Sequence, residues 1–148
     1  METLEEYEKI CDRITQKNEE YLKEFEDSLI ASGLSEKTIK RHENNAEFYI
    51  DTYLLRVGPS NMEEGCDKLD DFFGYFFIRK CMWSTPANIK TTAASLKKFY
   101  KLMLEHGHIK QENYQELLDA IEYNMEDWQE TCKQYNDPQS ENPYLRYL

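Results

Sequence analysis

The segment from residue 84 to residue 109 carries a complete set of helix signals. Ser84 or Thr85 can act as the N-cap, and Pro86 suits the first helical position, where its missing N–H loses no partner. Gly107 stands where a left-handed residue ends a helix. Between these ends, apolar side chains recur at steps of three and four, at Ile89, Ala93, Leu96, Tyr100, Met103 and Leu104. The segment is therefore predicted to be a helix with one buried face.

The same periodicity predicts four further helices, over about residues 4–31, 36–56, 67–81 and 111–135. Only five glycines and four prolines interrupt the 148 residues, and helix-period patterns dominate. The expected fold class is all-α: a bundle of about five helices with the helix at residues 84–109 at its centre. Residues 1–136 are expected to form a single domain. Residues 137–148 contain Asp137-Pro138 and Asn142-Pro143, so they are predicted to be an irregular tail.

Both terminal helices have a heptad-like apolar seam. The seam of the last helix includes Tyr114, Leu118, Ile121, Met125 and Trp128. Such seams are typical of a protein partner or homodimer interface, and also of two helices that pack within one chain. The intramolecular interpretation is favoured because a single domain must bury both stripes.

The net charge of −11 is distributed unevenly. Residues 1–33 carry −6, residues 34–110 carry +2, and residues 111–148 carry −7. An acidic chain as a whole repels nucleic acid, but this distribution leaves a mildly basic middle between two acidic ends. The objection to a nucleic-acid partner is therefore weaker than the total charge implies.

A second stripe on the helix at residues 84–109 consists of Lys90, Lys97 and Lys101, with Lys98 beside it. No acidic residue occurs in that helix before Glu105. Lysines in such a row can neutralise phosphates, and hydroxyls at helix starts can add hydrogen bonds to an anion. The candidates for that second role are Ser35, Thr38, Thr85 and Thr91. The alternative interpretation is a solvated lysine face on an ordinary bundle helix.

The sequence predicts no enzyme active site, cofactor or metal site. His106-x-His108 has no third ligand at a defined spacing, and two histidines near a helix end are typical of C-terminal capping. The cysteines show no CxxC spacing, which favours reduced thiols. The first residues lack the apolar core of a signal peptide, and the longest apolar run, residues 72–78, is too short to cross a bilayer. A cytoplasmic location without membrane contact is expected.

From about residue 21 to residue 109 the chain carries a series of apolar, aromatic and helix-start residues in a defined order. Phe25 and Leu29 precede Gly33-Leu34-Ser35, and Thr38-Ile39 follow. Next come Phe48, Tyr49, Ile50, Tyr53 and Leu54, and then the helix start at residues 84–90 and the stretch SLKKFYKLMLEHGHI at residues 95–109. In this order and spacing the chain resembles the core-binding domain of tyrosine recombinases, the SAM-like module of phage integrases.

This resemblance implies a four-helix module, here with extended N- and C-terminal helices, that crosses one face of duplex DNA. It also implies that the second and fourth helices of the module supply the DNA contacts. The catalytic domain of the family is missing, since no His-x-x-Arg occurs anywhere in the chain. The expected function is therefore non-catalytic binding of duplex DNA in an integrase-like role related to DNA recombination. The candidate DNA-binding residues are Ser35, Lys37, Thr38, Lys40, Arg41, Thr85, Lys90, Thr91, Lys97, Lys98 and Lys101.

The alternative function belongs to a different class. An acidic helical protein-interaction domain would use the seam of the last helix, or would mimic DNA in the basic groove of another protein.

Overall fold

The computed structural model describes residues 3–56, 58–81 and 83–147, and in those ranges helices and their connecting turns are present without a strand. The long helices are α1 (Leu4–Ala31), α2 (Glu36–Glu47), α6 (Pro86–Glu105) and α7 (Gln111–Asn136). Shorter segments are η1 (Phe48–Tyr53), α3 (Leu54–Arg56), η2 (Met62–Asp67), α4 (Leu69–Asp71), η3 (Phe72–Phe76), α5 (Phe77–Lys80) and η4 (Pro143–Tyr147). The segments α2, η1 and α3 follow one another without a break and form one continuous helix, and so do α4, η3 and α5. The predicted all-α bundle is therefore confirmed.

Local chemistry explains the helix ends. Thr3 begins α1 with a capping box, in which its hydroxyl accepts the Glu6 N–H at 3.1 Å. At the start of α6 the sequence left two N-cap candidates, and the structure selects Thr85, whose hydroxyl accepts the Asn88 N–H at 3.0 Å. Ser84 is instead buried, and its hydroxyl lies 3.3 Å from the Ile78 carbonyl oxygen.

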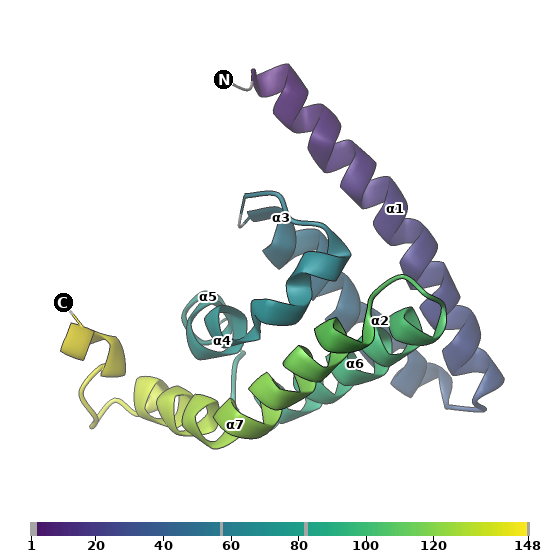
Figure 1. Ribbon diagram of the computed structural model, residues 1–148. Coiled ribbons are helices and arrows are strands. Elements are labelled where there is room, and N and C mark those ends of the chain that lie inside the picture. The colour runs from purple at the N-terminus through teal and green to yellow at the C-terminus, as the bar shows by residue number, and fades with distance from the viewer. Residues whose placement is uncertain (1–2, 57, 82, 148) are drawn as a thin grey trace.

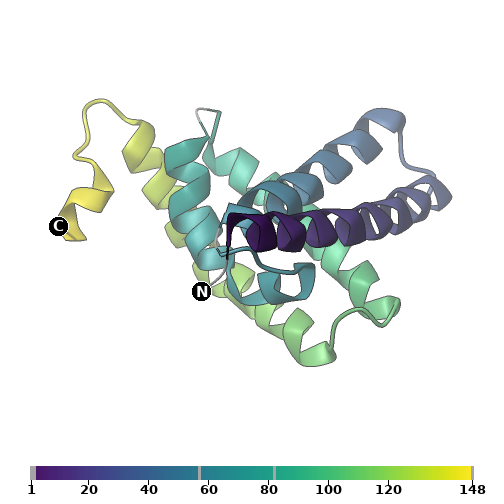
Figure 2. The same cartoon turned by 90° about the horizontal axis from the view of Figure 1, so that it is seen from above.

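Helix α6 lies in the middle of the bundle. It packs against α7 on one side and α2 on the other, and its C-terminal end meets α1 (Figures 1 and 2). Its buried residues include Ile89, Leu96 and Phe99. The two acidic terminal helices therefore flank the central pair, with α1 alongside α2 and α7 alongside α6.

The seam of α7 packs inside the chain. Ile121 and Trp128 are buried, and Tyr114, Leu118 and Met125 are half-buried against the same core. These seam side chains therefore pack against other helices of the same chain, as in the intramolecular interpretation. The seam of α1 is buried only from Ile14 onward, because the first turns of that helix extend beyond the other helices (Figure 1).

Two π-helical segments, η1 and η3, face each other in an aromatic core. Phe48 follows the exposed Arg41 by seven residues, or two turns, and by this spacing it should lie on the outward side of its helix. It is instead half-buried, with its ring centroid 6.0 Å from that of Phe72 and 5.9 Å from that of Trp83. The reason is that the helix at residues 69–80 covers this side of η1, so both sides of η1 are enclosed.

The C-terminal segment is more ordered than the sequence indicated. The predicted irregular tail contains the 3-10 helix η4, and the Tyr144 hydroxyl donates a hydrogen bond of 2.7 Å to the Gly74 carbonyl oxygen. The Tyr144 ring also lies against those of Tyr75 and Tyr135. Tertiary contacts with the η3 helix and α7, rather than local propensity, therefore fix the tail.

Among the described residues, no helix combines the length and apolarity that crossing a bilayer requires. The four cysteines are unpaired, and burial raises the pKa of the Cys66 thiol to about 12.

Candidate nucleic-acid interface

The seven basic side chains singled out on α2 and α6 all lie on the surface. They are Lys37, Lys40, Arg41, Lys90, Lys97, Lys98 and Lys101. In the described ranges none of them forms an ion pair. By contrast, Lys9, Lys17 and Lys23 on α1 each pair with an acid of their own helix. In a chain with net charge −11, the bases of the central helices thus keep their charge uncompensated by direct contacts.

A buried polar junction joins α2 to α6. The Asn45 side-chain amide donates to the Ser95 hydroxyl at 3.0 Å, and the His42 Nδ1 atom lies 2.8 Å from the same oxygen. The Ser95 hydroxyl lies 3.3 Å from the Thr91 carbonyl oxygen, to which its single proton can be donated. The direction of the His42–Ser95 hydrogen bond depends on the tautomer of the imidazole ring. The two helices are therefore held in register by three polar side chains.

This junction brings positive charge together from both helices. Burial lowers the pKa of His42, and the nearby charges of Arg41 and Lys98 lower it further. Helical spacing places Lys37 and Arg41 in line with Asn45, at steps of four. Thr91 and Lys98 are likewise in line with Ser95 on α6. The two lines meet at the Asn45–Ser95 hydrogen bond, so Arg41 of α2 and Lys98 of α6 lie near each other at this junction.

The remaining lysines of α6 form a neighbouring row. Lys90, Lys97 and Lys101 recur at steps of seven and four, so they follow one line along the helix. All three are exposed, although α7 packs against α6. The acidic helix therefore borders this row without covering it.

The predicted hydroxyl groups serve their own helices. Ser35 accepts the Thr38 N–H at 3.2 Å and donates to the Thr38 hydroxyl at 2.9 Å. Thr85 accepts the Asn88 N–H, as described above, and Thr91 donates to the Asn88 carbonyl oxygen at 3.2 Å. The Thr85 hydroxyl proton is not used by these bonds, so it can still be donated to an anion.

Lys40 lies on the side of α2 that faces α1. It lines a groove between α1 and α2 together with the acids Glu26, Glu36 and Glu43. One carboxylate oxygen of Glu43 is buried and lacks a hydrogen-bond partner in the described part of the chain. Burial raises the pKa of Glu43, the nearby Glu26 carboxylate raises it further, and Lys40 opposes the change. Lys40 therefore belongs to an acidic environment.

We predict that Glu43→Gln stabilises the protein at pH 7 by about 1 kcal/mol, because the neutral amide removes a buried charge and can donate to Glu26. The pKa of Glu43 is higher in the folded protein than in the unfolded chain, where it is near 4.5. Glu43 therefore favours folding at a pH below 4.5, and this contribution is lost as the pH rises through the pKa of the folded state. The gain should therefore vanish at pH 4. Urea denaturation at both pH values measures it. Glu122→Gln makes the same charge change at an exposed site on α7, so it removes no buried charge and should give no comparable gain at pH 7.

The polar junction was not predicted from the sequence. Its signal was present, since His42 lies three residues after Ile39 and four before Ala46, on the inward stripe of its helix. Ser95 similarly stands four residues before Phe99. A polar residue on an apolar stripe indicates a buried hydrogen bond, but its partner lies 53 residues away and follows only from the docking of the helices.

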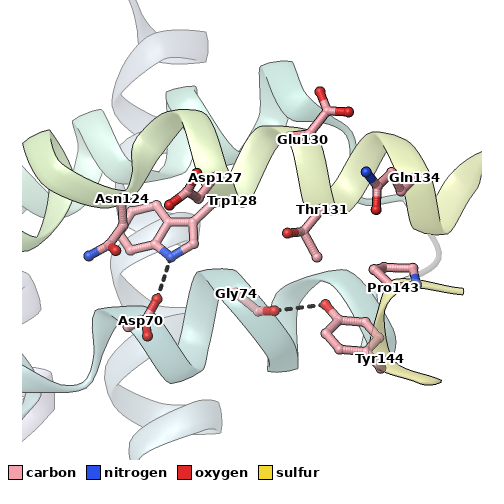
Figure 3. A pocket seen from close by; sticks show the side chains of 10 residues that line it. All are labelled: Asp70, Gly74, Asn124, Asp127, Trp128, Glu130, Thr131, Gln134, Pro143 and Tyr144. Atoms are coloured by element: carbon pink, nitrogen blue, oxygen red, sulfur yellow. Dashed lines mark hydrogen bonds between the residues drawn. The ribbon is translucent and has the colours of Figure 1, made fainter. Parts of the chain in front are cut away.

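A surface depression of about 450 Å³ lies beside α7, where that helix faces α4 and η3 (Figure 3). It is bordered by α7, the helix of α4 and η3, and the C-terminal tail, and three acids line it: Asp70, Asp127 and Glu130. The Asp70 carboxylate accepts a hydrogen bond of 2.8 Å from the Trp128 indole N–H. The described lining contains no histidine, cysteine or lysine. Its acidic character repels phosphate, so the depression is not part of the basic surface.

Comparison of the chain with protein-family models, with curated proteins and with solved structures gives no significant match. The resemblance to the core-binding domain of tyrosine recombinases therefore remains a prediction from the sequence.

Proposed function

We propose that the protein is a non-catalytic DNA-binding module that contacts the phosphate backbone of duplex DNA through α2 and α6. The observation that carries the proposal is the meeting of positive charge from both helices, Arg41 of α2 and Lys98 of α6, at the His42–Ser95 junction. The row of Lys90, Lys97 and Lys101 extends this surface along α6. Contacts of this kind give affinity and salt dependence without reading bases.

The arrangement of the acidic helices supports the same proposal. Helix α1 lies alongside α2 and helix α7 alongside α6 (Figure 1). The basic side chains of α2 and α6 stay exposed. Both flanking helices are acidic, which disfavours contact of phosphate with them and favours contact with α2 and α6. Lys40 lies in the acidic groove, so we assign it no phosphate contact.

The test is a salt titration of binding to a labelled duplex, followed by fluorescence anisotropy. The slope of log K against log salt is about −0.9 for each phosphate neutralised. Changing Lys90, Lys97 and Lys101 to Gln should make the slope less steep by up to about 0.9 per lysine. The matched control changes Lys9, Lys17 and Lys23 of α1 to Gln, which alters the net charge by the same amount. Its slope should equal that of the parent.

Two results would reject the proposal. One is an equal change of slope in both triple variants, since the effect would then follow from net charge alone. The other is a parent protein that does not bind duplex DNA at low salt.

A second candidate function rests on the exposed face of α7. Seven acids lie on it: Glu112, Glu116, Asp119, Glu122, Glu126, Asp127 and Glu130. Tyr123 stands among them with 85% of its surface exposed, and an exposed aromatic within a charged surface is a common anchor of protein interfaces. A basic protein partner fits this face. Binding of a basic peptide that Tyr123→Ala weakens, without any binding of DNA, would favour this function.

A further inference from the structure

The C-terminal end of α6 has a Schellman motif that places two histidines together. Gly107 adopts a φ of 77°, its N–H donates to the Leu104 carbonyl oxygen at 3.0 Å, and the His108 N–H donates to the Met103 carbonyl oxygen at 2.8 Å. The left-handed residue reverses the chain between His106 and His108. Both imidazoles therefore face α1 rather than lying on opposite sides of the turn.

Helix α1 presents a carboxylate to both rings. Glu24 lies more than 80 residues away in the sequence, and its Oε1 atom is in hydrogen-bond contact with His106 Nδ1. The same oxygen lies 3.0 Å from His108 Nε2, and Glu24 Oε2 lies 3.1 Å from it. One ligand atom from each of the three residues lies within 4.8 Å of the other two. The fold thus supplies the third group that sequence spacing did not reveal.

Two imidazole nitrogens and one carboxylate oxygen form a familiar donor set for zinc, which takes these ligands at about 2.0–2.2 Å. Tetrahedral ligand atoms around such an ion lie about 3.3 Å apart, by the same bond lengths. The 3.0 and 3.1 Å separations of His108 from Glu24 are close to that value. His106 Nδ1 is in direct contact with Glu24 Oε1, so side-chain rotation must separate these two atoms before an ion can be bound between them.

The surroundings suit a three-ligand site with an open fourth position. The side chains of His106, His108 and Glu24 are 41%, 27% and 31% exposed, so water can reach an ion between them. The buried Tyr21 ring packs edge-on against the His108 ring, with centroids 4.9 Å apart, and limits its rotation. Restricted ligand side chains lose less entropy when they bind a metal.

We propose that Glu24, His106 and His108 bind a zinc ion that joins α1 to the turn between α6 and α7. Two ligands come from one turn and the third from a distant helix, so the ion acts as a cross-link in the tertiary structure. The proposal is independent of DNA binding.

The experiment is isothermal titration calorimetry of the tag-free, chelator-treated protein with Zn²⁺, in a Cys11→Ser background that removes the half-exposed thiol. We expect one ion per chain, and an affinity that falls at least tenfold in each of Glu24→Gln, His106→Ala and His108→Ala. Glu20→Gln is the matched control, since it removes an exposed carboxylate one turn earlier on α1 and should bind Zn²⁺ like the parent. Mg²⁺, which prefers oxygen ligands, should give no comparable heat.

Thermal unfolding provides a second measurement that separates metal binding from the loss of the Glu24–histidine contacts. Zn²⁺ should raise the melting temperature of the parent and of Glu20→Gln, but should leave that of Glu24→Gln unchanged. The relevant quantity is the shift caused by the ion, so a variant that is less stable without metal remains informative. The proposal is wrong if the parent does not bind Zn²⁺ at micromolar concentration, or if the three ligand variants retain the affinity of the parent.

Discussion

Replacing Phe72 with alanine is expected to destabilise the protein by about 3–5 kcal/mol, as for other fully buried aromatic residues. Phe72 has no exposed surface and stands at the centre of the aromatic core. Its ring centroid lies within 5 Å of those of Tyr49, Tyr53 and Phe73. The substitution leaves a cavity between η1 and η3, and close-packed rings on both sides cannot collapse into it without moving a helix. Small domains have a total stability of about 5–15 kcal/mol, so most of it could be lost.

Urea denaturation followed by far-ultraviolet circular dichroism measures this effect. Tyr75→Ala is the matched control, because it removes an aromatic ring from the same η3 segment at a position that is 43% exposed. Its cost should be well below that of Phe72→Ala. If Phe72→Ala does not fold, Phe72→Leu retains part of the volume and should give a smaller, measurable loss. Equal losses for Tyr75→Ala and Phe72→Leu would contradict the assigned role of Phe72.

The helices were predictable because their signals are local. Thr85 caps α6 through an amide only three residues away, and Gly107 ends the helix through its own left-handed conformation. The exposure of Lys90, Lys97 and Lys101 likewise follows from their spacing beside an apolar stripe. Residues whose environment depends on one helix can be placed from the periodicity of that helix.

The remaining features depend on contacts between distant segments. His42 meets Ser95 only because α2 docks on α6, and Glu24 meets the two histidines only because α1 passes the end of α6. Periodicity sets which face of each helix is buried, but not which residue of another helix it meets. The two π-helical segments and the ordering of the tail by Tyr144 are likewise products of packing.

Gly65→Ala is expected to destabilise the protein by about 3 kcal/mol, because the added methyl group overpacks a filled core. A Cβ atom at this position would clash with the Tyr100 hydroxyl, and would lie 2.9 Å from side-chain atoms of Leu54 and Tyr49. The surrounding hydroxyls cannot easily withdraw. Tyr49 donates to the Gly65 carbonyl oxygen at 2.5 Å, and Tyr100 donates to that of Met62 at 2.7 Å.

These two hydrogen bonds link the candidate DNA-binding surface to the core. Tyr49 belongs to the continuation of α2 and Tyr100 to α6, so the η2 backbone between them helps to set the separation of the two basic helices. Burial raises the pKa of both hydroxyls, so both remain neutral donors over the accessible pH range. A variant that folds with a displaced η2 should therefore also bind duplex DNA more weakly, if α2 and α6 act together.

A double-mutant cycle distinguishes this steric mechanism from a general intolerance of the 3-10 helix to alanine. Tyr100→Phe removes the hydroxyl that the new methyl group would strike, at the cost of one hydrogen bond. The loss of stability in the double variant with Gly65→Ala should therefore be smaller than the sum of the two single losses. Gly33→Ala provides a contrast, since its Cβ meets no atom within 4 Å and only the φ of 75° opposes it, at a cost of about 1 kcal/mol. Strict additivity at Gly65 and Tyr100 would show that the clash is relieved elsewhere, and that η2 does not hold α2 and α6 at a fixed distance.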